Sequence, residues 1–130
     1  MNMEKFTERS RGFVQAAQTI AIREENQRVM PEHLLKALMD DEQGFASNLI
    51  SRAGGDPAAV RQAADQAVAK QPKVSGGQGQ VYVDPSLVRV LDEAEKLAKK
   101  AGDSFVPAER LLTALAVVNT NARDALTAGH

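Results

Sequence analysis

The strongest constraint on the fold is a helical segment that the chain contains twice. Residues 31–39 read PEHLLKALM and residues 108–116 read AERLLTALA. Leu34 and Leu111 are 77 positions apart (111 − 34), and the same offset relates Glu32 to Glu109. Other apolar pairs at this offset are Phe13 with Val90, Val14 with Leu91, Ala17 with Ala94, Ile20 with Leu97, Ala21 with Ala98, and Val29 with Val106. Such a repeat predicts two similar halves that bury each other's open face.

The apolar residues recur every three to four positions, which is typical of amphipathic helices. Aromatic residues make up only 4% of a chain that is 43% hydrophobic, so aliphatic side chains and Ala must fill the core. This composition favours helices over sheets. We predict an all-α fold of about eight helices in two pseudo-twofold four-helix repeats. The segments that read as helices are 7–26, 30–41, 46–53, 57–70, 85–101, a helix opening at Pro107, and 122–127.

Local signals place several helix ends. Thr7 is positioned to cap the first helix, and Asp56-Pro57 and Asp84-Pro85 both combine an N-cap with a first-turn proline. Residues 71–83, QPKVSGGQGQVYV, are rich in Gly, Pro, Ser and Gln, and read as a flexible connector. Within it QVYV has no obvious partner strand. We therefore expect one domain over 1–130, with repeat one at about 1–70, a linker at 71–83 and repeat two at 84–130.

Charge and composition exclude several classes of function. The formal net charge is −1, without the basic excess that nucleic acid binding favours. The absence of cysteine excludes disulfides and thiolate metal sites. The opening residues, MNMEKFTERSRGF, contain no long apolar run, so neither a signal peptide nor a membrane span is expected. We expect a soluble, cytoplasmic protein that binds neither nucleic acid nor membrane.

No catalytic or metal-binding motif stands out. The Gly-rich SGGQGQ at 75–80 lacks the Gly-Lys-Ser/Thr ending of a phosphate-binding loop, and reads as a linker. The two histidines are His33 and His130, and neither belongs to an HExxH motif. No G-x-S-x-G elbow is present. We predict no metal, no bound cofactor and no enzymatic activity for this chain, and we interpret His33 as a helix-surface or helix-packing residue.

Three acidic residues have two readings each. Glu32 and Glu109 both lie in the first turn of a Leu-Leu helix, where an acid interacts favourably with the helix dipole. Alternatively, they form two related acidic sites for a cationic group of a partner. Asp103 follows Gly102 in a turn, where it either caps the turn or contacts a bound peptide.

The helix at 85–101 has more apolar residues than one stripe needs. Leu87, Val88, Val90 and Leu91 lie close together and cover more than one side. Either both sides are buried in the core, or one side lines a groove for apolar peptide segments.

The chain resembles the Clp N-terminal domain, the repeat domain at the front of the Hsp100/Clp unfoldases. The resemblance covers essentially the whole chain. It is carried by FTERSRGFVQAAQTIAIREENQRVMPEHLLKALM, by QVYVDPSLVRVLDEAEKLAKKAGDSFVPAERLLTAL and by the doubled layout. The connector GGQGQVYVDPSLVRVLDEAEK is most similar to the disaggregase branch, the ClpB type.

The resemblance implies a function and a set of partners. The full-length protein would be a homohexameric AAA+ ATPase that uses ATP and magnesium. It would thread unfolded or aggregated polypeptides through its pore together with the Hsp70 system. The N-domain would be a mobile, monomeric module that captures exposed apolar segments. These 130 residues contain no Walker motif, so they are not expected to hydrolyse ATP.

The resemblance also implies a set of peptide-contact residues. They are Thr7, Leu91 in LVRVL, Asp103 in GDSF and Glu109, with Glu32, Val88 and Arg110 as secondary candidates. In the disaggregase branch an apolar residue follows the glutamate, whereas this chain has Arg110. The alternative is an adaptor-docking or phosphoarginine-docking domain of a ClpA-type or ClpC-type ATPase that partners a protease. ClpC-type relatives present TEH in both repeats, but the second copy here reads AER.

Overall fold

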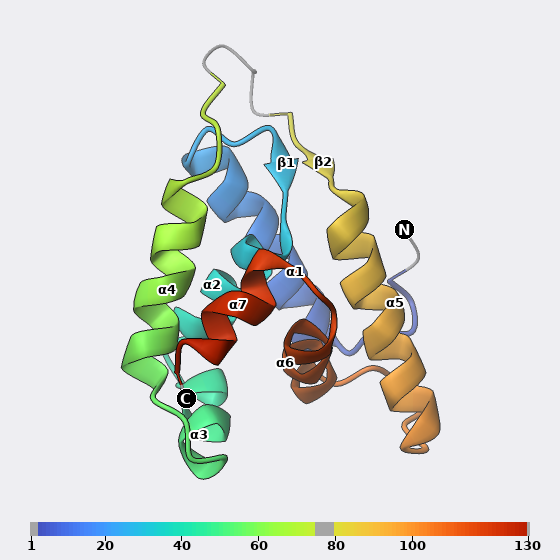
Figure 1. Cartoon of the computed structure of the whole chain (residues 1–130). Helices are drawn as coiled ribbons and strands as arrows, with labels where there is room; N and C mark the ends of the chain where they lie inside the picture. The colour runs from blue at the N-terminus through green and yellow to red at the C-terminus, as the bar shows by residue number, and fades with distance from the viewer. Residues whose placement is uncertain (1–2, 75–79, 130) are drawn as a thin grey trace.

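Helices form most of the computed structural model, which describes residues 3–74 and 80–129 (Figure 1). Its elements are α1 (Glu8–Arg23), β1 (Arg28–Val29), α2 (Pro31–Met39), α3 (Phe45–Arg52), α4 (Pro57–Ala69), β2 (Tyr82–Val83), α5 (Pro85–Lys100), α6 (Ala108–Val117) and α7 (Asn121–Thr127). The predicted all-α class is confirmed. Most of the SGGQGQ segment lies outside the described residues.

The helices of the two repeats correspond at the offset seen in the sequence. α1 and α5 are both 16 residues long, and α5 begins 77 positions after α1 (85 − 8). α6 begins at the position equivalent to the start of α2, and α7 overlaps the positions equivalent to α3. The counterpart of α4 would fall at about 134–146, past residue 130. The described residues therefore contain seven helices rather than the expected eight.

The first helix of each repeat begins and ends in the same way. The Thr7 hydroxyl accepts a hydrogen bond from the Ser10 amide, and the Asp84 carboxylate caps α5 from the equivalent position. After α1 the chain turns through Glu25 with a φ of 58°, and after α5 it turns through Gly102 with a φ of 81°. A left-handed residue is a common way to end a helix. The two repeats thus share their turns as well as their helices.

Residues 82–83 of the QVYV segment are extended and have a partner strand, which was not obvious from the sequence. β2 pairs with β1 in parallel, which places Tyr82 beside Arg28 and Val83 beside Val29. In the equivalent positions, Phe6 forms a parallel bridge with Val106. Each repeat therefore supplies the extended segment that pairs with the other, and we call this arrangement the reciprocal strand exchange.

Backbone hydrogen bonds show that the two halves of the reciprocal strand exchange are alike. The Thr7 amide donates to the Val106 carbonyl at 3.1 Å, and the Asp84 amide donates to the Val29 carbonyl at 3.0 Å. Thr7 and Asp84 are counterparts, and so are Val106 and Val29. Thr7 and Asp84 thus each cap a helix and also hydrogen-bond to the other repeat.

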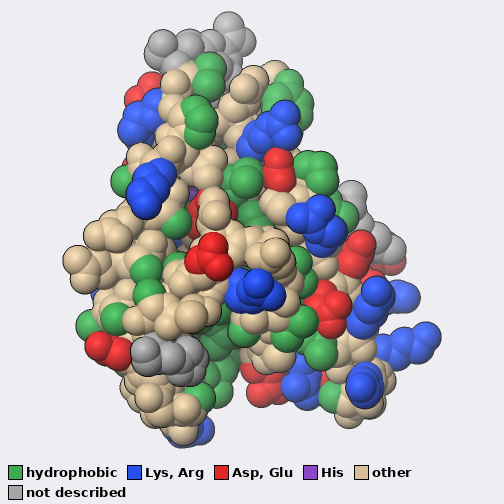
Figure 2. Space-filling view, in the orientation of Figure 1, with side chains coloured by type: hydrophobic (Ala, Val, Ile, Leu, Met, Phe, Trp, Pro, Cys, Tyr) green, Lys and Arg blue, Asp and Glu red, His purple; other side chains and the backbone are tan. Residues whose placement is uncertain are grey.

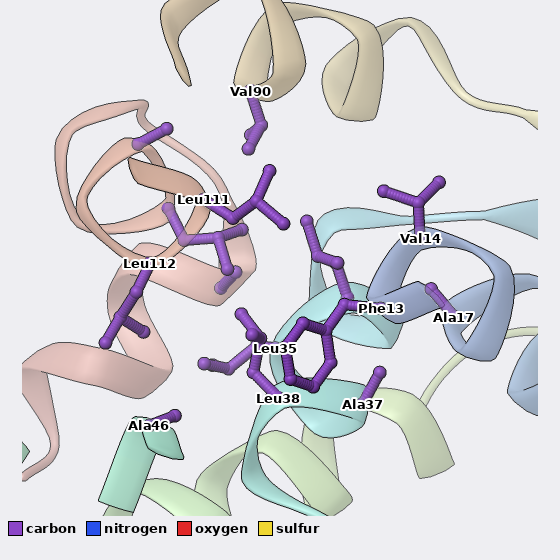
Figure 3. Packing of buried hydrophobic residues seen from close by; sticks show 14 of the residues in the cluster. Phe13, Val14, Ala17, Leu35, Ala37, Leu38, Ala46, Val90, Leu111 and Leu112 are labelled. Atoms are coloured by element: carbon purple, nitrogen blue, oxygen red, sulfur yellow. The ribbon is translucent and has the colours of Figure 1, made fainter. Parts of the chain in front are cut away.

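The core lies where the repeated Leu-Leu helices meet. α1 packs against α2, α5 packs against α6, and α2 also contacts α5 and α6. Side chains from α2 and α6 share one interior region with Phe13 of α1 (Figure 3). The fully buried leucines are Leu34, Leu35, Leu38, Leu87, Leu111 and Leu115. The repeats bury each other's apolar faces, as the sequence pattern predicts.

Within the described residues, no helix is long and apolar enough to cross a membrane. The same residues contain no group of three or more His, Cys, Asp or Glu side chains arranged to hold a metal ion.

Candidate functional site

Three of the predicted site residues lie together near the start of α6. The Arg110 Nε donates to the Asp103 Oδ2 at 3.0 Å, and each of these side chains is 28% exposed. Glu109 precedes Arg110 in the first turn of α6 and is exposed. Asp103 caps no helix, since the N-cap of α6 is Pro107. Its carboxylate is paired with Arg110 instead, and contact between Asp103 and a bound peptide stays a prediction.

Thr7 lies beside this segment, where it caps α1 and joins the two repeats. Its amide bonds to Val106, and its hydroxyl accepts from the Ser10 amide at 3.1 Å and donates to the Ser10 Oγ at 3.0 Å. The side chain is partly buried. Any contact between Thr7 and a ligand would therefore occur at the junction of the two repeats.

Leu91, predicted to contact a bound peptide, is buried in the structure. It is 2% exposed and belongs to the core with Leu87 and Val90. Val88 is partly buried on the same helix. Burial in the core thus explains most of the apolar excess of α5, and a peptide contact through Leu91 stays a prediction.

Glu32 and Glu109 are not two equivalent surface sites, which corrects that interpretation. Glu32 is fully buried, because α4 and the following residues cover this end of α2. Its Oε2 accepts from the Gln71 Nε2 at 2.6 Å and from the Asn121 Nδ2 at 3.3 Å. Its Oε1 is buried without a hydrogen-bond partner in the described chain. Glu109, at the equivalent position of α6, is exposed among the residues that the structure describes.

A hollow of about 520 Å³ opens beside Asp103. It is lined by the charged side of α5, by Lys5 and by the segment from Asp103 to Val106. Phe105 lies on its wall and is 57% exposed, an unusual position for a large apolar side chain. Sequence reasoning missed Phe105. One sequence feature could have indicated its exposure. At the 77-residue offset the counterpart of Phe105 is Arg28, so Phe105 is not one of the matched apolar positions that form the core.

A second hollow, of about 320 Å³, lies between α3, α6 and α7. Its floor is apolar, and Glu109 and Arg110 form part of its edge. In repeat one the equivalent face of α2 is covered by α4, which buries Met39 at the position matching Ala116. The apolar floor is therefore a helix-packing face, and we assign the candidate site to Asp103, Phe105, Glu109 and Arg110.

Charges are mixed on the visible surface. On the face drawn in Figure 2, Lys and Arg side chains alternate with Asp and Glu side chains rather than forming one basic patch. The lining of the first hollow contains both Lys96 and Lys99 and Asp92 and Glu95. Such a surface lacks the single-sign field that steers nucleic acids.

The counterparts of the Asp103–Arg110 pair in repeat one are Asn26 and His33, and they are also in contact. The His33 Nε2 lies 2.8 Å from the Asn26 Oδ1, and the His33 Nδ1 accepts from the Met30 amide at 2.8 Å. Nε2 therefore carries the proton. His33 is fully buried, which confirms the helix-packing interpretation. Burial lowers the pKa of His33 from 6.5 to about 4, and the nearby Glu24 only partly opposes this.

We expect stability to fall as the pH drops from 6.5 towards 4. The pKa of His33 is lower in the folded chain, so the unfolded chain takes up the proton first. The contribution is fully present above pH 6.5 and amounts to at most about 3 kcal/mol. Urea titrations at several pH values measure it. In H33Q the fall in stability over this range should flatten. The variant then keeps one histidine, His130, and no longer has the buried imidazole whose pKa is lowered by folding. An equally steep decline in the variant would contradict the assignment.

The family follows from a comparison of the whole sequence. A sequence model of the Clp repeat (R) N-terminal domain matches residues 5–128. The chain belongs to this family. This Clp N-terminal domain is 58% identical over 117 residues to the chaperone protein ClpB of Agrobacterium fabrum, an alignment that covers 90% of the chain. It is 38% identical over 128 residues to ClpB of Rickettsia felis, with 98% of the chain covered.

The aligned region is a small part of these relatives. It covers 13% of the Agrobacterium protein and 15% of the Rickettsia protein. Activities of the whole ClpB protein therefore do not transfer to this Clp N-terminal domain by identity alone.

Solved structures confirm the fold. The Hsp104 N-terminal domain from Candida albicans superposes with a TM-score of 0.86 at 22% identity, covering 97% of this chain and 83% of that one. The N-terminal domain of the ClpV1 ATPase from Escherichia coli gives a TM-score of 0.79 at 20% identity, with coverages of 95% and 77%. At such identities the likeness shows the shared Clp N-terminal fold. The resemblance seen in the sequence is thus confirmed.

Proposed function

We propose that this domain is the polypeptide-binding module of a ClpB-type disaggregase. It captures exposed apolar segments of unfolded or aggregated proteins and delivers them to the AAA+ ring of the longer protein. The observation that carries the proposal is 58% identity to a ClpB chaperone over 90% of the chain. The surface formed by Asp103, Phe105, Glu109 and Arg110 supports it, because an exposed aromatic ring with polar neighbours suits a flexible peptide.

The remaining activities belong to the longer protein. ATP, magnesium, the homohexamer and the cooperation with the Hsp70 system are proposed for that protein, of which this chain is a small part. A cytoplasmic location is proposed with them. In this proposal the domain binds polypeptide segments and the AAA+ ring hydrolyses ATP.

Binding by one domain is expected to be weak. The candidate surface is small, and ordering a flexible polypeptide costs free energy for each immobilised residue. We expect a Kd weaker than about 1 µM. Six copies in a hexamer would raise the apparent affinity by local concentration.

The test is a titration of the ¹⁵N-labelled chain with reduced, carboxymethylated α-lactalbumin, which stays unfolded in buffer. We expect amide shifts at residues 103–110 and at Thr7. Phe105→Ala should weaken binding at least threefold through the loss of apolar contact. Val117→Ala is the matched control, because Val117 is similarly exposed (52%) at the far end of α6.

Native α-lactalbumin with its disulfides intact should cause no shifts, since its apolar segments are buried. If the unfolded protein also leaves the amides of 103–110 unchanged at high excess, direct capture is wrong. Docking of an adaptor or a phosphoarginine would then be the better account of this surface.

A further inference from the structure

The start of the connector, residues 71–74, forms a strap that lies on repeat one. The Val74 amide donates to the Glu25 carbonyl at 2.8 Å. The Asn26 Nδ2 donates to the Pro72 carbonyl at 3.2 Å. These bonds join the strap to the turn after α1 through the strap's own backbone, in the manner of a short added strand.

Polar contacts, rather than apolar burial, hold the strap. The Lys73 Nζ donates to the Glu24 carbonyl at 2.8 Å and lies 3.7 Å from the Glu24 carboxylate. Residues 72–74 are exposed, and Val74 is 41% exposed. An element with little buried apolar surface opens more readily than the packed helices around it.

Buried polar side chains gather beneath the strap. The described residues contain four buried polar or charged side chains, and three of them lie here, namely Asn26, Glu32 and His33; the fourth is Ser10. The His33 Nε2 lies 2.8 Å from the Asn26 Oδ1. Opening the strap would admit water to this cluster. Closure therefore depends on how well these groups are hydrogen-bonded while the strap covers them.

Glu32 joins the strap to repeat two. The Gln71 Nε2 of the strap donates to the Glu32 Oε2 at 2.6 Å, and the Asn121 Nδ2 of α7 donates to the same oxygen at 3.3 Å. Gln71 and Asn121 also line one hollow of about 370 Å³ between α4 and α7. One fully buried carboxylate oxygen thus receives a donor from the connector and a donor from the other repeat.

The seating of α7 determines whether Asn121 reaches this acid. The Thr120 hydroxyl caps α7 by accepting from the Ala122 and Arg123 amides, which places Asn121 at the first residue of the helix. α7 packs against α4 of repeat one and α6 of repeat two (Figure 1). The Asn121 side chain therefore lies between the repeats and contacts Glu32 only while α7 keeps this position.

The energetics of a buried carboxylate make the two donors interdependent. Taking a carboxylate out of water costs free energy unless N–H groups replace the lost water. The closed strap covers Glu32, and Asn121 supplies one of the two donors that compensate. Without Asn121, closing the strap would bury the same charge with one donor fewer, whereas the open strap leaves Glu32 hydrated. The contact from α7 thus favours the closed strap.

We propose that α7 controls the connector strap through Glu32. While Asn121 donates to Glu32 the strap stays closed, and displacement of α7 releases residues 71–74 from repeat one. The coupling is reciprocal, so opening the strap also loosens α7. It gives repeat two a means of switching the start of the connector, and it operates whether or not the candidate site binds polypeptide.

The test measures amide hydrogen exchange at Val74 in the ¹⁵N-labelled full chain without any ligand. Asn121→Ala should speed this exchange about three- to tenfold, the effect of losing one hydrogen bond to a charged group. Asn119→Ala is the matched control, because it changes the same residue type just before α7 and its Oδ1 accepts from Arg123 instead. The control should change the exchange rate at Val74 by less than about twofold.

A charge substitution tests the other donor. Gln71→Glu keeps the size of the side chain but places a second carboxylate against Glu32, so exchange at Val74 should rise more than about tenfold. Gln66→Glu makes the same charge change on α4, in the lining of the same hollow. Within the described residues no hydrogen bond joins Gln66 to Glu32, so this control should have little effect.

A double variant shows whether the two donors act through one acid. In the Gln71→Ala background the strap no longer reaches Glu32, so Asn121→Ala should add less than about twofold at Val74. An equal effect in both backgrounds, or unchanged exchange in Asn121→Ala alone, would overturn the inference. Equal acceleration at the Leu35 amide of α2 would mean global destabilisation and would also overturn it. An unprotected Val74 amide in the unaltered chain would show that the strap is not closed in solution.

Discussion

Replacing Leu111 with alanine is expected to lower the free energy of unfolding by about 3 kcal/mol. Leu111 is fully buried where α6 meets the other repeat, so the change removes buried contacts and leaves a cavity. Leu34→Ala, at the equivalent position of α2, should cost a similar amount, because Leu34 is also fully buried. Urea unfolding followed by circular dichroism measures both. Val117→Ala, an exposed apolar site on α6, should change the free energy of unfolding by less than about 0.5 kcal/mol.

Urea unfolding followed by NMR of individual amides tests whether the two repeats unfold together. Because α2 of repeat one contacts α5 and α6 of repeat two, we expect one transition for the whole chain. Leu111→Ala should therefore lower the urea midpoint of amides in both repeats. A variant in which repeat two unfolds first, while repeat one keeps its original midpoint, would show that the repeats are independent.

Phe6→Ala is expected to cost about 3 kcal/mol, the low end of the range for a buried phenylalanine. Phe6 is 2% exposed and pairs with Val106 across the repeats. The control is Phe105→Ala, which removes a phenylalanine ring from the residue just before Val106. Phe105 is 57% exposed, so this change should cost less than about 0.5 kcal/mol.

Amide hydrogen exchange gives a second measurement of the same change. The Val106 amide donates to the Lys5 carbonyl at 2.7 Å, and this bond depends on the packing of Phe6. Phe6→Ala should speed exchange at Val106 and at Thr7 more than at buried amides of α2. If Phe6→Ala were as mild as Phe105→Ala, the N-terminal segment would not hold repeat two in solution.

Features decided by local chemistry could be predicted from the sequence. Thr7 and Asp84 cap their helices as expected, because a cap depends on a side chain and on amides two or three positions away. The 77-residue offset of the Leu-Leu helices also predicted where the core lies. The all-helical class followed from the same spacing.

Features decided by distant neighbours could not be predicted. Glu32 and Glu109 are the same residue type at the same repeat position, yet α4 buries one and leaves the other exposed. The two-residue strand Tyr82–Val83 is too short to show a period, and its partner lies more than fifty positions earlier. Of the candidate site, the sequence indicated Asp103, Glu109 and Arg110. Phe105 was missed, although its counterpart Arg28 places it outside the matched core positions.

The reciprocal strand exchange has a consequence for how the chain is made. During synthesis Phe6 leaves the ribosome about a hundred residues before Val106, the residue with which it pairs. Repeat one cannot bury that ring against its partner until most of repeat two has emerged. Long-range pairing of this kind delays folding, because the intervening chain must first be ordered. The domain is thus expected to acquire its native structure late and in one step, after its second Leu-Leu helix has been translated.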